Sequence, residues 1–156
     1  MALFASQISE CVDAVAAWMK SKRLQLNPAK TAALWCATSR RRHQLPTTAM
    51  LVDGIPVTPV QNVRDLGIYI DGDLSMRTHI QRTTSSCFAA LRQLRQIRRF
   101  VPTATFQTLT VALVNQRLDY GNSTLVGIPA YLMRRLVSIE RCRTADFPSQ
   151  TLRPHY

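Results

Sequence analysis

Residues 73–101 read DLSMRTHIQRTTSSCFAALRQLRQIRRFV, and their pattern predicts the architecture of the second half of the chain. Its apolar side chains recur at the spacing of an α-helix, at Ile80, Cys87, Phe88, Leu91, Leu94, Ile97 and Val101. Asp73 or Ser75 can cap this helix, and Pro102 ends it. At about 100° per residue, one edge of the apolar stripe is lined by Arg77, Arg92, Arg95 and Arg99. We therefore predict a long helix that carries both part of a core and a ridge of positive charge.

The charge of the whole chain is strongly positive. Its 156 residues include 20 Lys and Arg against 9 Asp and Glu, a formal net charge of +11. Seventeen of the basic residues are arginine, the side chain best suited to forked contacts with phosphate. No acidic residue lies between Asp73 and Asp119, whereas seven arginines do. This distribution indicates a polyanionic partner, although surplus arginine also arises from a solvated face or from codon bias.

Helical spacing returns twice after Pro102. The first run, which Thr103 can cap, extends to about Leu118, and the second begins at Pro129, a favoured first-turn residue. Beyond Arg143 no period persists. We therefore expect a basic helical bundle over residues 73–143 and a disordered, divergent tail over residues 144–156.

The first 72 residues combine one helix with short strands. Apolar residues from Phe4 to Met19 predict an amphipathic helix, and strands are expected over residues 30–37 and 66–70. Asp53-Gly54 lies between two apolar triplets and is typical of a tight hairpin. The predicted fold class is therefore α+β, with a helix on a small antiparallel sheet over residues 1–72 and a helical bundle after it.

Residues that could bind a metal or catalyse a reaction are sparse. The four cysteines and three histidines are too scattered to form a local ligand pair, so we interpret the cysteines as reduced, mostly buried thiols. Asp71-Gly72-Asp73 could in principle hold a hard cation, yet such turns more often use their acids for turn hydrogen bonds and helix capping. We therefore predict no catalytic residue, no metal site and no cofactor bound by this chain alone.

The sequence shows no pattern typical of a secretory signal or a membrane span. Glu10 and Asp13 interrupt the early apolar residues, which argues against a secretory signal. No stretch approaches the roughly 20 apolar residues of a membrane span. We expect an intracellular protein, in the nucleus or the cytoplasm, that is neither secreted nor bound to a membrane.

Three short segments follow one another in a fixed order: RLQLNPAKT at residues 23–31, LGIYID at residues 66–71 and RLDYGN at residues 117–122. Together they resemble the downstream part of the reverse transcriptases, or RNA-directed DNA polymerases, of LINE-type (non-LTR) retrotransposons. In that family of transposable elements, the aspartates that bind catalytic magnesium lie upstream of all three segments. The resemblance covers roughly residues 8–139, and it implies a palm remnant over residues 1–72 and a thumb over residues 73–143.

The resemblance also suggests roles for two residues of the first half. Lys30 matches a palm lysine of the family, placed near the triphosphate, where an ammonium could neutralise or protonate the leaving group. Alternatively, Lys30 is an ordinary strand-edge lysine. Gly67 lies in the segment that resembles the primer grip, which implies a hairpin whose backbone lies against the primer end. The lack of a Cβ there lets a nucleic acid strand approach, and a bulge in a buried strand would explain Gly67 equally.

The thumb of the family tracks the template–primer duplex through its phosphates, a role that fits Arg77, Arg92, Arg95 and Arg99. The predicted function is thus that of a reverse transcriptase fragment without the catalytic Asp-Asp turn, inactive alone and at most a sequence-independent binder of RNA or DNA. Two alternatives remain open. One is a small interaction protein that self-associates, or joins an intact polymerase, through exposed palm surface. The other is a non-functional retrotransposon remnant.

Overall fold

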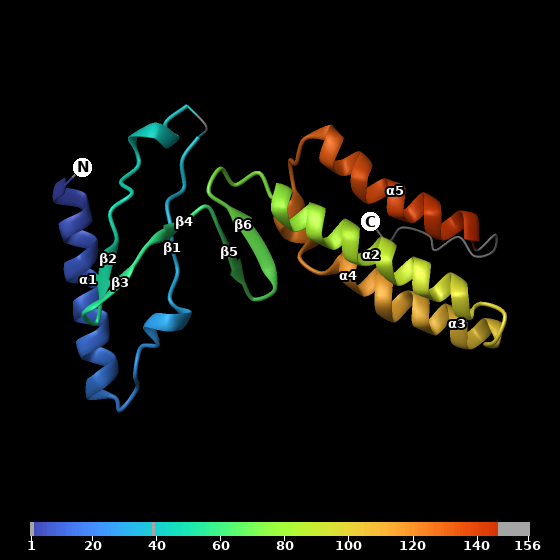
Figure 1. Cartoon of the computed structure of the whole chain (residues 1–156), viewed down its shortest axis with the longest axis horizontal. Helices are drawn as coiled ribbons and strands as arrows, with labels where there is room; N and C mark the ends of the chain where they lie inside the picture. The colour runs from blue at the N-terminus through green and yellow to red at the C-terminus, as the bar shows by residue number, and fades with distance from the viewer. Residues whose placement is uncertain (1, 39, 147–156) are drawn as a thin grey trace. The chain divides into compact units, whose positions relative to one another are not determined.

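The computed structural model describes residues 2–38 and 40–146, and it mixes helices with short strands (Figure 1). The predicted α+β class is confirmed. The chain divides into two compact units, the first ending at Ser75 and the second beginning at Met76, where the sequence placed a boundary after residue 72.

The first unit opens with one long helix, α1 (Ala2–Ser21). The helix ends in a hydrogen-bonded turn in which the amide of Leu24 donates to the carbonyl of Met19 at 2.9 Å and the amide of Arg23 donates to that of Lys20 at 3.0 Å. This pattern needs a left-handed residue after the helix, usually glycine, and Arg23 occupies the position with φ 58°. The predicted helix is confirmed, although Cys11, Val15 and Trp18 of its apolar stripe are exposed.

Short elements follow α1 in the first unit: the 3₁₀ turns η1 (Pro28–Lys30) and η2 (Arg42–Gln44), and the strands β1 (Ala33–Leu34), β2 (Met50–Val52), β3 (Ile55–Val57), β4 (Pro59–Val60), β5 (Asn62–Asp65) and β6 (Ile68–Asp71). In the described part of the chain these strands form three two-stranded sheets, β1 with β4, β2 with β3 and β5 with β6. The β1–β4 pair is parallel. The expected single antiparallel sheet is therefore wrong, because strands this short, interrupted by Pro56 and Pro59, do not extend into one ladder.

The predicted hairpin at Asp53-Gly54 is confirmed. Strands β2 and β3 pair antiparallel, with Val52 opposite Ile55, and the two turn residues have φ values of 49° and 78°. Both are left-handed, as a two-residue turn that matches strand twist requires. Helix α1 packs on β2, and Ala16, Val52 and Val57 are buried there. The ammonium of Lys20 lies 2.6 Å from Asp53 Oδ1, an exposed ion pair that adds little stability.

A second hairpin joins β5 to β6, in the segment whose resemblance to the primer grip implies one. Its turn consists of Leu66 and Gly67, with φ values of 45° and 88°, and Asp65 pairs with Ile68 across it. The strand expected over residues 66–70 therefore begins only at Ile68. Gly67 is not a bulge in a buried strand, because it is the second of the two left-handed residues of a turn.

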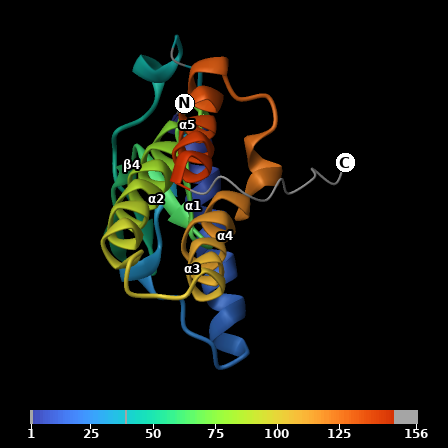
Figure 2. The ribbon, with the colours of Figure 1, turned by 90° about the vertical axis from the view of Figure 1, so that its right-hand side faces the viewer.

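The second unit is a bundle of three helical segments (Figures 1 and 2). Its elements are α2 (Arg77–Ile97), α3 (Thr103–Thr110), the π-helical segment η3 (Val111–Asn115), α4 (Gln116–Asp119), the 3₁₀ turn η4 (Asn122–Leu125) and α5 (Ala130–Asp146). Because α3, η3 and α4 follow without interruption, they act as one helix over residues 103–119. Helix α2 packs against both that helix and α5. The three helices expected from the sequence are thus confirmed.

Two boundaries of the second unit differ from expectation. Met76, with φ 56°, occupies the N-cap position of α2, and neither Asp73 nor Ser75 does. Helix α5 continues to Asp146, so the tail expected from residue 144 is wrong for its first three residues. The rest of that tail, residues 147–156, lies outside the described residues.

The core of the second unit follows the predicted stripe. Cys87, Ala90, Leu91 and Leu94 of α2 are buried against Phe106, Val114 and Ile139 of the other two helices. Ile97 is the exception in the predicted stripe, since it is 39% exposed at the end of α2. Among the described residues of the first unit, by contrast, the buried apolar side chains are only Ala16, Val52 and Val57. The two units therefore differ greatly in how much apolar surface they bury.

No helix in the described residues combines the length and the apolar character needed to cross a membrane.

Candidate nucleic-acid interface

The predicted arginine ridge divides into two parts along α2. Arg77 is the first residue of the helix, Arg92 and Arg95 lie in its last two turns, and Arg99 follows in the turn after it. All four side chains are exposed. At 1.5 Å per residue, Arg77 and Arg92 are about 22 Å apart along the axis. The structure thus places three of the four arginines at one end of the helix and Arg77 at the other.

Arg98 adds a fourth positive charge to the C-terminal end of α2. Its guanidinium lies over the ring of Phe106, 4.8 Å from the ring centre, and Phe106 is only 1% exposed. The contact is a cation–π interaction that also covers the edge of the core. The sequence did not single out Arg98, because its angle places it toward the apolar stripe rather than on the ridge.

Helix electrostatics account for part of this arrangement. Positive side chains near a helix C-terminus interact favourably with the helix dipole, by about 0.3–1 kcal/mol each at exposed sites. Arg95, Arg98 and Arg99 lie where this effect acts. Arg77 lies at the opposite, unfavourable end, and the first turn of α2 contains no acidic residue. The cluster at the C-terminal end is therefore compatible with fold stability.

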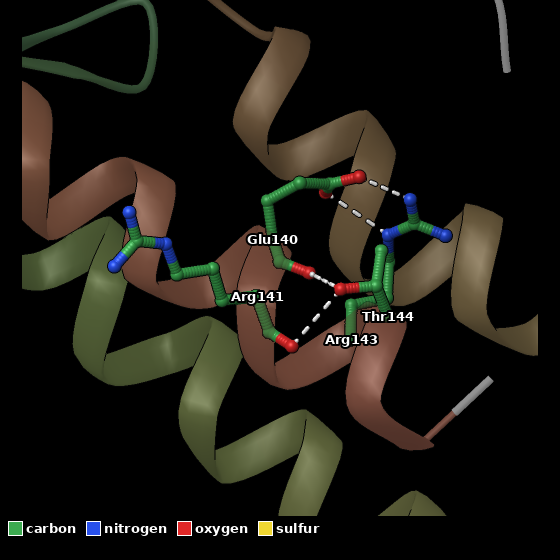
Figure 3. A network of polar contacts seen from close by, with 4 residues as sticks. All are labelled: Glu140, Arg141, Arg143 and Thr144. Atoms are coloured by element: carbon green, nitrogen blue, oxygen red, sulfur yellow. Dashed lines mark hydrogen bonds and ion pairs between the residues drawn. The ribbon is translucent and has the colours of Figure 1, made fainter. Parts of the chain in front are cut away.

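Acidic residues of the second unit lie away from this cluster in sequence, and two of them have other partners. Glu140 accepts two hydrogen bonds from Arg143, one of them 2.9 Å long at Nε, and these raise the pKa of Arg143 (Figure 3). Asp119 accepts a hydrogen bond from the side chain of Asn122 at 3.4 Å. Among the described residues, neither Arg92 nor Arg99 has an acidic partner. Their charges remain available to a ligand.

Lys30 lies in the first unit, on the turn η1 and not on a strand edge. The side chain of Asn27 accepts a hydrogen bond from the amide of Ala29 at 3.1 Å, and the carbonyl of Asn27 accepts bonds from Lys30 and Thr31. The Asn and Thr of the NPAKT sequence thus hold a local turn. The strand-edge interpretation of Lys30 is wrong, and its side chain is exposed.

The carboxylates of Asp71 and Asp73 serve the turn after β6. Asp73 Oδ1 accepts a hydrogen bond from the amide of Ser75 at 3.0 Å, and its Oδ2 lies 3.7 Å from Arg42. The hydroxyl of Ser75 lies 3.5 Å from Asp71 Oδ2. In residues 2–38 and 40–146, no group of three or more His, Cys, Asp or Glu could hold a metal ion. The contacts of Asp71 and Asp73 that the structure shows thus belong to the turn after β6.

Gly72, between these two aspartates, has a role that the sequence did not reveal. A Cβ on this residue would lie 3.0 Å from the carbonyl oxygen of Trp35. Its amide donates to Gln61 and its carbonyl accepts from Ala37, both at 2.9 Å. Gly72 therefore lets three chain segments of the first unit approach one another closely.

The interpretation of the cysteines as mostly buried is wrong. Cys11 and Cys36 are exposed, Cys142 is half-buried and only Cys87 is buried. Burial raises the pKa of the Cys87 thiol, and the positive charge of Arg117 opposes this effect. Cys36 also lines an open hollow with Ala37, Thr38, Arg40 and Arg41. All four thiols are free, so no disulfide among them stabilises either unit.

No family model matches this sequence, and searches of curated proteins and of solved structures also found no match.

Proposed function

We propose that the second unit binds nucleic acid without sequence preference, through Arg92, Arg95 and Arg99 at the C-terminal end of α2. The observation that carries this proposal is a cluster of exposed arginines in a stretch of 45 residues without a single acidic side chain. Guanidinium groups bind phosphate in forked geometry, and phosphate contacts give affinity without reading bases. Arg77 supplies a further contact at the other end of the helix.

The three sequence segments support a polymerase ancestry for this proposal. On that reading the first unit is a palm remnant, the second is a thumb, and the chain descends from a LINE-type reverse transcriptase. Template-directed synthesis needs carboxylates that hold two metal ions. Since Asp71 and Asp73 are engaged in a turn, we propose that this chain alone does not polymerise and that its remaining activity is to grip RNA or DNA.

Charge removal at the cluster tests the proposal. We expect Arg92→Gln, Arg95→Gln and Arg99→Gln together to weaken binding to every duplex sequence, because each change removes a phosphate contact. If all three contacts exist, the slope of log affinity against log salt becomes less steep by about 2.7 for B-form DNA. Fluorescence anisotropy with labelled duplexes between 50 and roughly 200 mM salt measures both quantities.

The matched control removes the same charge from another helix. Arg134, Arg135 and Arg141 of α5 are also exposed, and changing them to Gln lowers the net charge equally. We expect a smaller loss of affinity from this second triple variant. Equal losses from the two variants would show that net charge, and not the α2 cluster, drives binding, and the proposal would then be wrong.

A second candidate function rests on the first unit. Val15, Trp18, Leu51 and Ile55 are each about half exposed or more, and Leu66 and Leu74 are 83% and 62% exposed. Exposed apolar side chains in one small unit are typical of a surface that meets a partner, here a second copy or an intact polymerase. Gel filtration at high salt separates the candidates: a salt-resistant oligomer without nucleic acid affinity favours this one. A chain that shows no cooperative melt by circular dichroism would instead favour a non-functional remnant.

A further inference from the structure

Phe100 lies in the turn between α2 and α3 and is 83% exposed. The next phenylalanine of the chain, Phe106, is 1% exposed and belongs to the core of the same unit. An aromatic ring left in water gives up the stabilisation that burial would supply. The core of the second unit thus does not use Phe100, and the ring is available to a ligand.

The backbone on both sides of Phe100 is held in place. The amide of Phe100 donates to the carbonyl of Ile97 at 2.9 Å, and that of Arg98 donates to the carbonyl of Arg95 at 3.4 Å. After the ring, Val101 packs against the core, and the amide of Phe106 donates to the carbonyl of Pro102 at 3.0 Å. A ring on a turn fixed in this way loses less freedom when it binds than one on a loose loop.

Positive charge lies immediately before the ring in sequence. Arg95, Arg98 and Arg99 come within five residues before it, and the turn lies at one end of the helical bundle, drawn in yellow in Figures 1 and 2. The nearest acidic residues before and after Phe100 in sequence are Asp73 and Asp119, both far from it. The turn therefore offers one flat apolar face among several guanidinium groups, which is the combination that binds unpaired nucleic acid.

We propose that the turn between α2 and α3 is a binding site for single-stranded RNA or DNA, in which Phe100 stacks on an unpaired base and Arg95 and Arg99 contact the flanking phosphates. This inference rests on the proposed function and adds a preference to it. Charge alone serves duplex and single strand alike, whereas stacking needs a base whose face is open. A single ring is too little apolar surface for stable binding in a membrane interface, which takes a whole apolar helix face or a lipid chain.

The test compares three labelled probes of about twelve nucleotides: a single strand of uridines, a duplex and an abasic strand. We expect Phe100→Ala to weaken single-strand binding by about 5- to 150-fold, the range measured for one stacked base, with the salt slope unchanged. Phe100→Tyr, which keeps a stacking ring, should bind as the native chain does. Phe100→Leu should lose as much affinity as Phe100→Ala. All three variants should bind the abasic strand as the native chain does.

Val126→Ala is the matched control, since Val126 is 86% exposed in another loop of the same unit. It should bind all probes as the native chain does, and circular dichroism should show every variant folded. Full binding of the uridine strand by Phe100→Leu would overturn the stacking site. Should Phe100→Ala bind normally while the triple arginine variant does not, this inference fails and the proposed function stands. If the native chain binds no probe at low salt, both fail.

Discussion

Two buried threonines of the second unit differ in how their hydroxyls are satisfied. Thr110, which is 4% exposed, donates its hydroxyl to the carbonyl of Phe106 at 2.9 Å. Thr84, which is 9% exposed, buries its hydroxyl without a hydrogen-bond partner among the described residues. An unsatisfied buried hydroxyl costs about 1–3 kcal/mol. Valine has nearly the same shape, so the two positions form a matched pair.

We predict that Thr84→Val raises the free energy of unfolding by about 1 kcal/mol, because it removes the unsatisfied hydroxyl. Thr110→Val, which removes a satisfied one, should leave the free energy unchanged or lower it. Urea denaturation followed by circular dichroism measures both. If Thr84→Val destabilises the protein as much as Thr110→Val does, the hydroxyl of Thr84 has a partner after all.

His79 makes the stability of the second unit depend on pH. It is 5% exposed, and burial lowers its pKa below the ordinary value of 6.5. The unfolded chain therefore takes up a proton at a higher pH than the folded chain does. We predict that the contribution of His79 to stability is fully present above about pH 7 and is lost as the pH drops through 6.5, until His79 is protonated in the folded state too. His79→Gln should reduce this loss of stability in urea melts between pH 7.5 and pH 5; an equal loss in the variant would assign it to other groups.

At the scale of single elements, sequence pattern predicts what periodicity and standard turn residues encode. The stripe from Ile80 to Val101 identified α2 and its core face, because seven apolar residues at this spacing share one face of an α-helix and of no other regular secondary structure. Asp53-Gly54 identified a hairpin because both residues tolerate a left-handed backbone. These two signals fixed most of the α+β assignment.

Elements that lack such signals were missed. Leu66 is a poor residue for a left-handed turn position, so the turn that it forms with Gly67 looked like the start of a strand. The π-helical segment over residues 111–115 keeps its apolar residues in ordinary helical order, so nothing in the sequence marks it. For the candidate site, the angle around the helix axis grouped Arg77 with Arg92, Arg95 and Arg99. That angle carries no information about position along the axis, where Arg77 and Arg92 are about 22 Å apart.

The left-handed backbone of Leu66 in the Leu66-Gly67 turn lowers the stability of the first unit. A non-glycine residue in the left-handed conformation costs about 1–2 kcal/mol, and asparagine tolerates it best among the alternatives. Because Leu66 is 83% exposed, its side chain contributes little packing. We therefore predict that Leu66→Asn stabilises the first unit by about 0.5–1 kcal/mol, whereas Leu66→Val, which is branched at Cβ, destabilises it. Thermal melts followed by tryptophan fluorescence measure both changes, and equal midpoints for the two variants would contradict the turn assignment.

At the scale of the whole molecule, the two units bury unequal cores. Eleven apolar side chains are buried among the described residues of the second unit, against three in the first. Stability follows buried apolar area, at roughly 25 cal/mol for each Å². The first unit should therefore unfold before the second, and the chain should not behave as a single two-state system.

This prediction can be checked with two optical probes. Both tryptophans, Trp18 and Trp35, belong to the first unit, so fluorescence follows that unit alone. Helical circular dichroism follows mainly the second unit, which contains α2 to α5. We predict that the fluorescence transition comes at a lower urea concentration than the dichroism transition. Coincident transitions would mean that the units unfold together.

The distance in sequence between α2 and α5 also has a consequence in time. Cys87 and Ile139 meet in the core of the second unit, yet about 50 residues of synthesis separate them. At roughly 5–20 residues per second, a ribosome needs about 3–10 s to cover that interval. During those seconds the apolar stripe of α2 has left the ribosome, but α5, which covers part of it, has not yet been made. We therefore expect the nascent chain to bind chaperones that shield apolar surface.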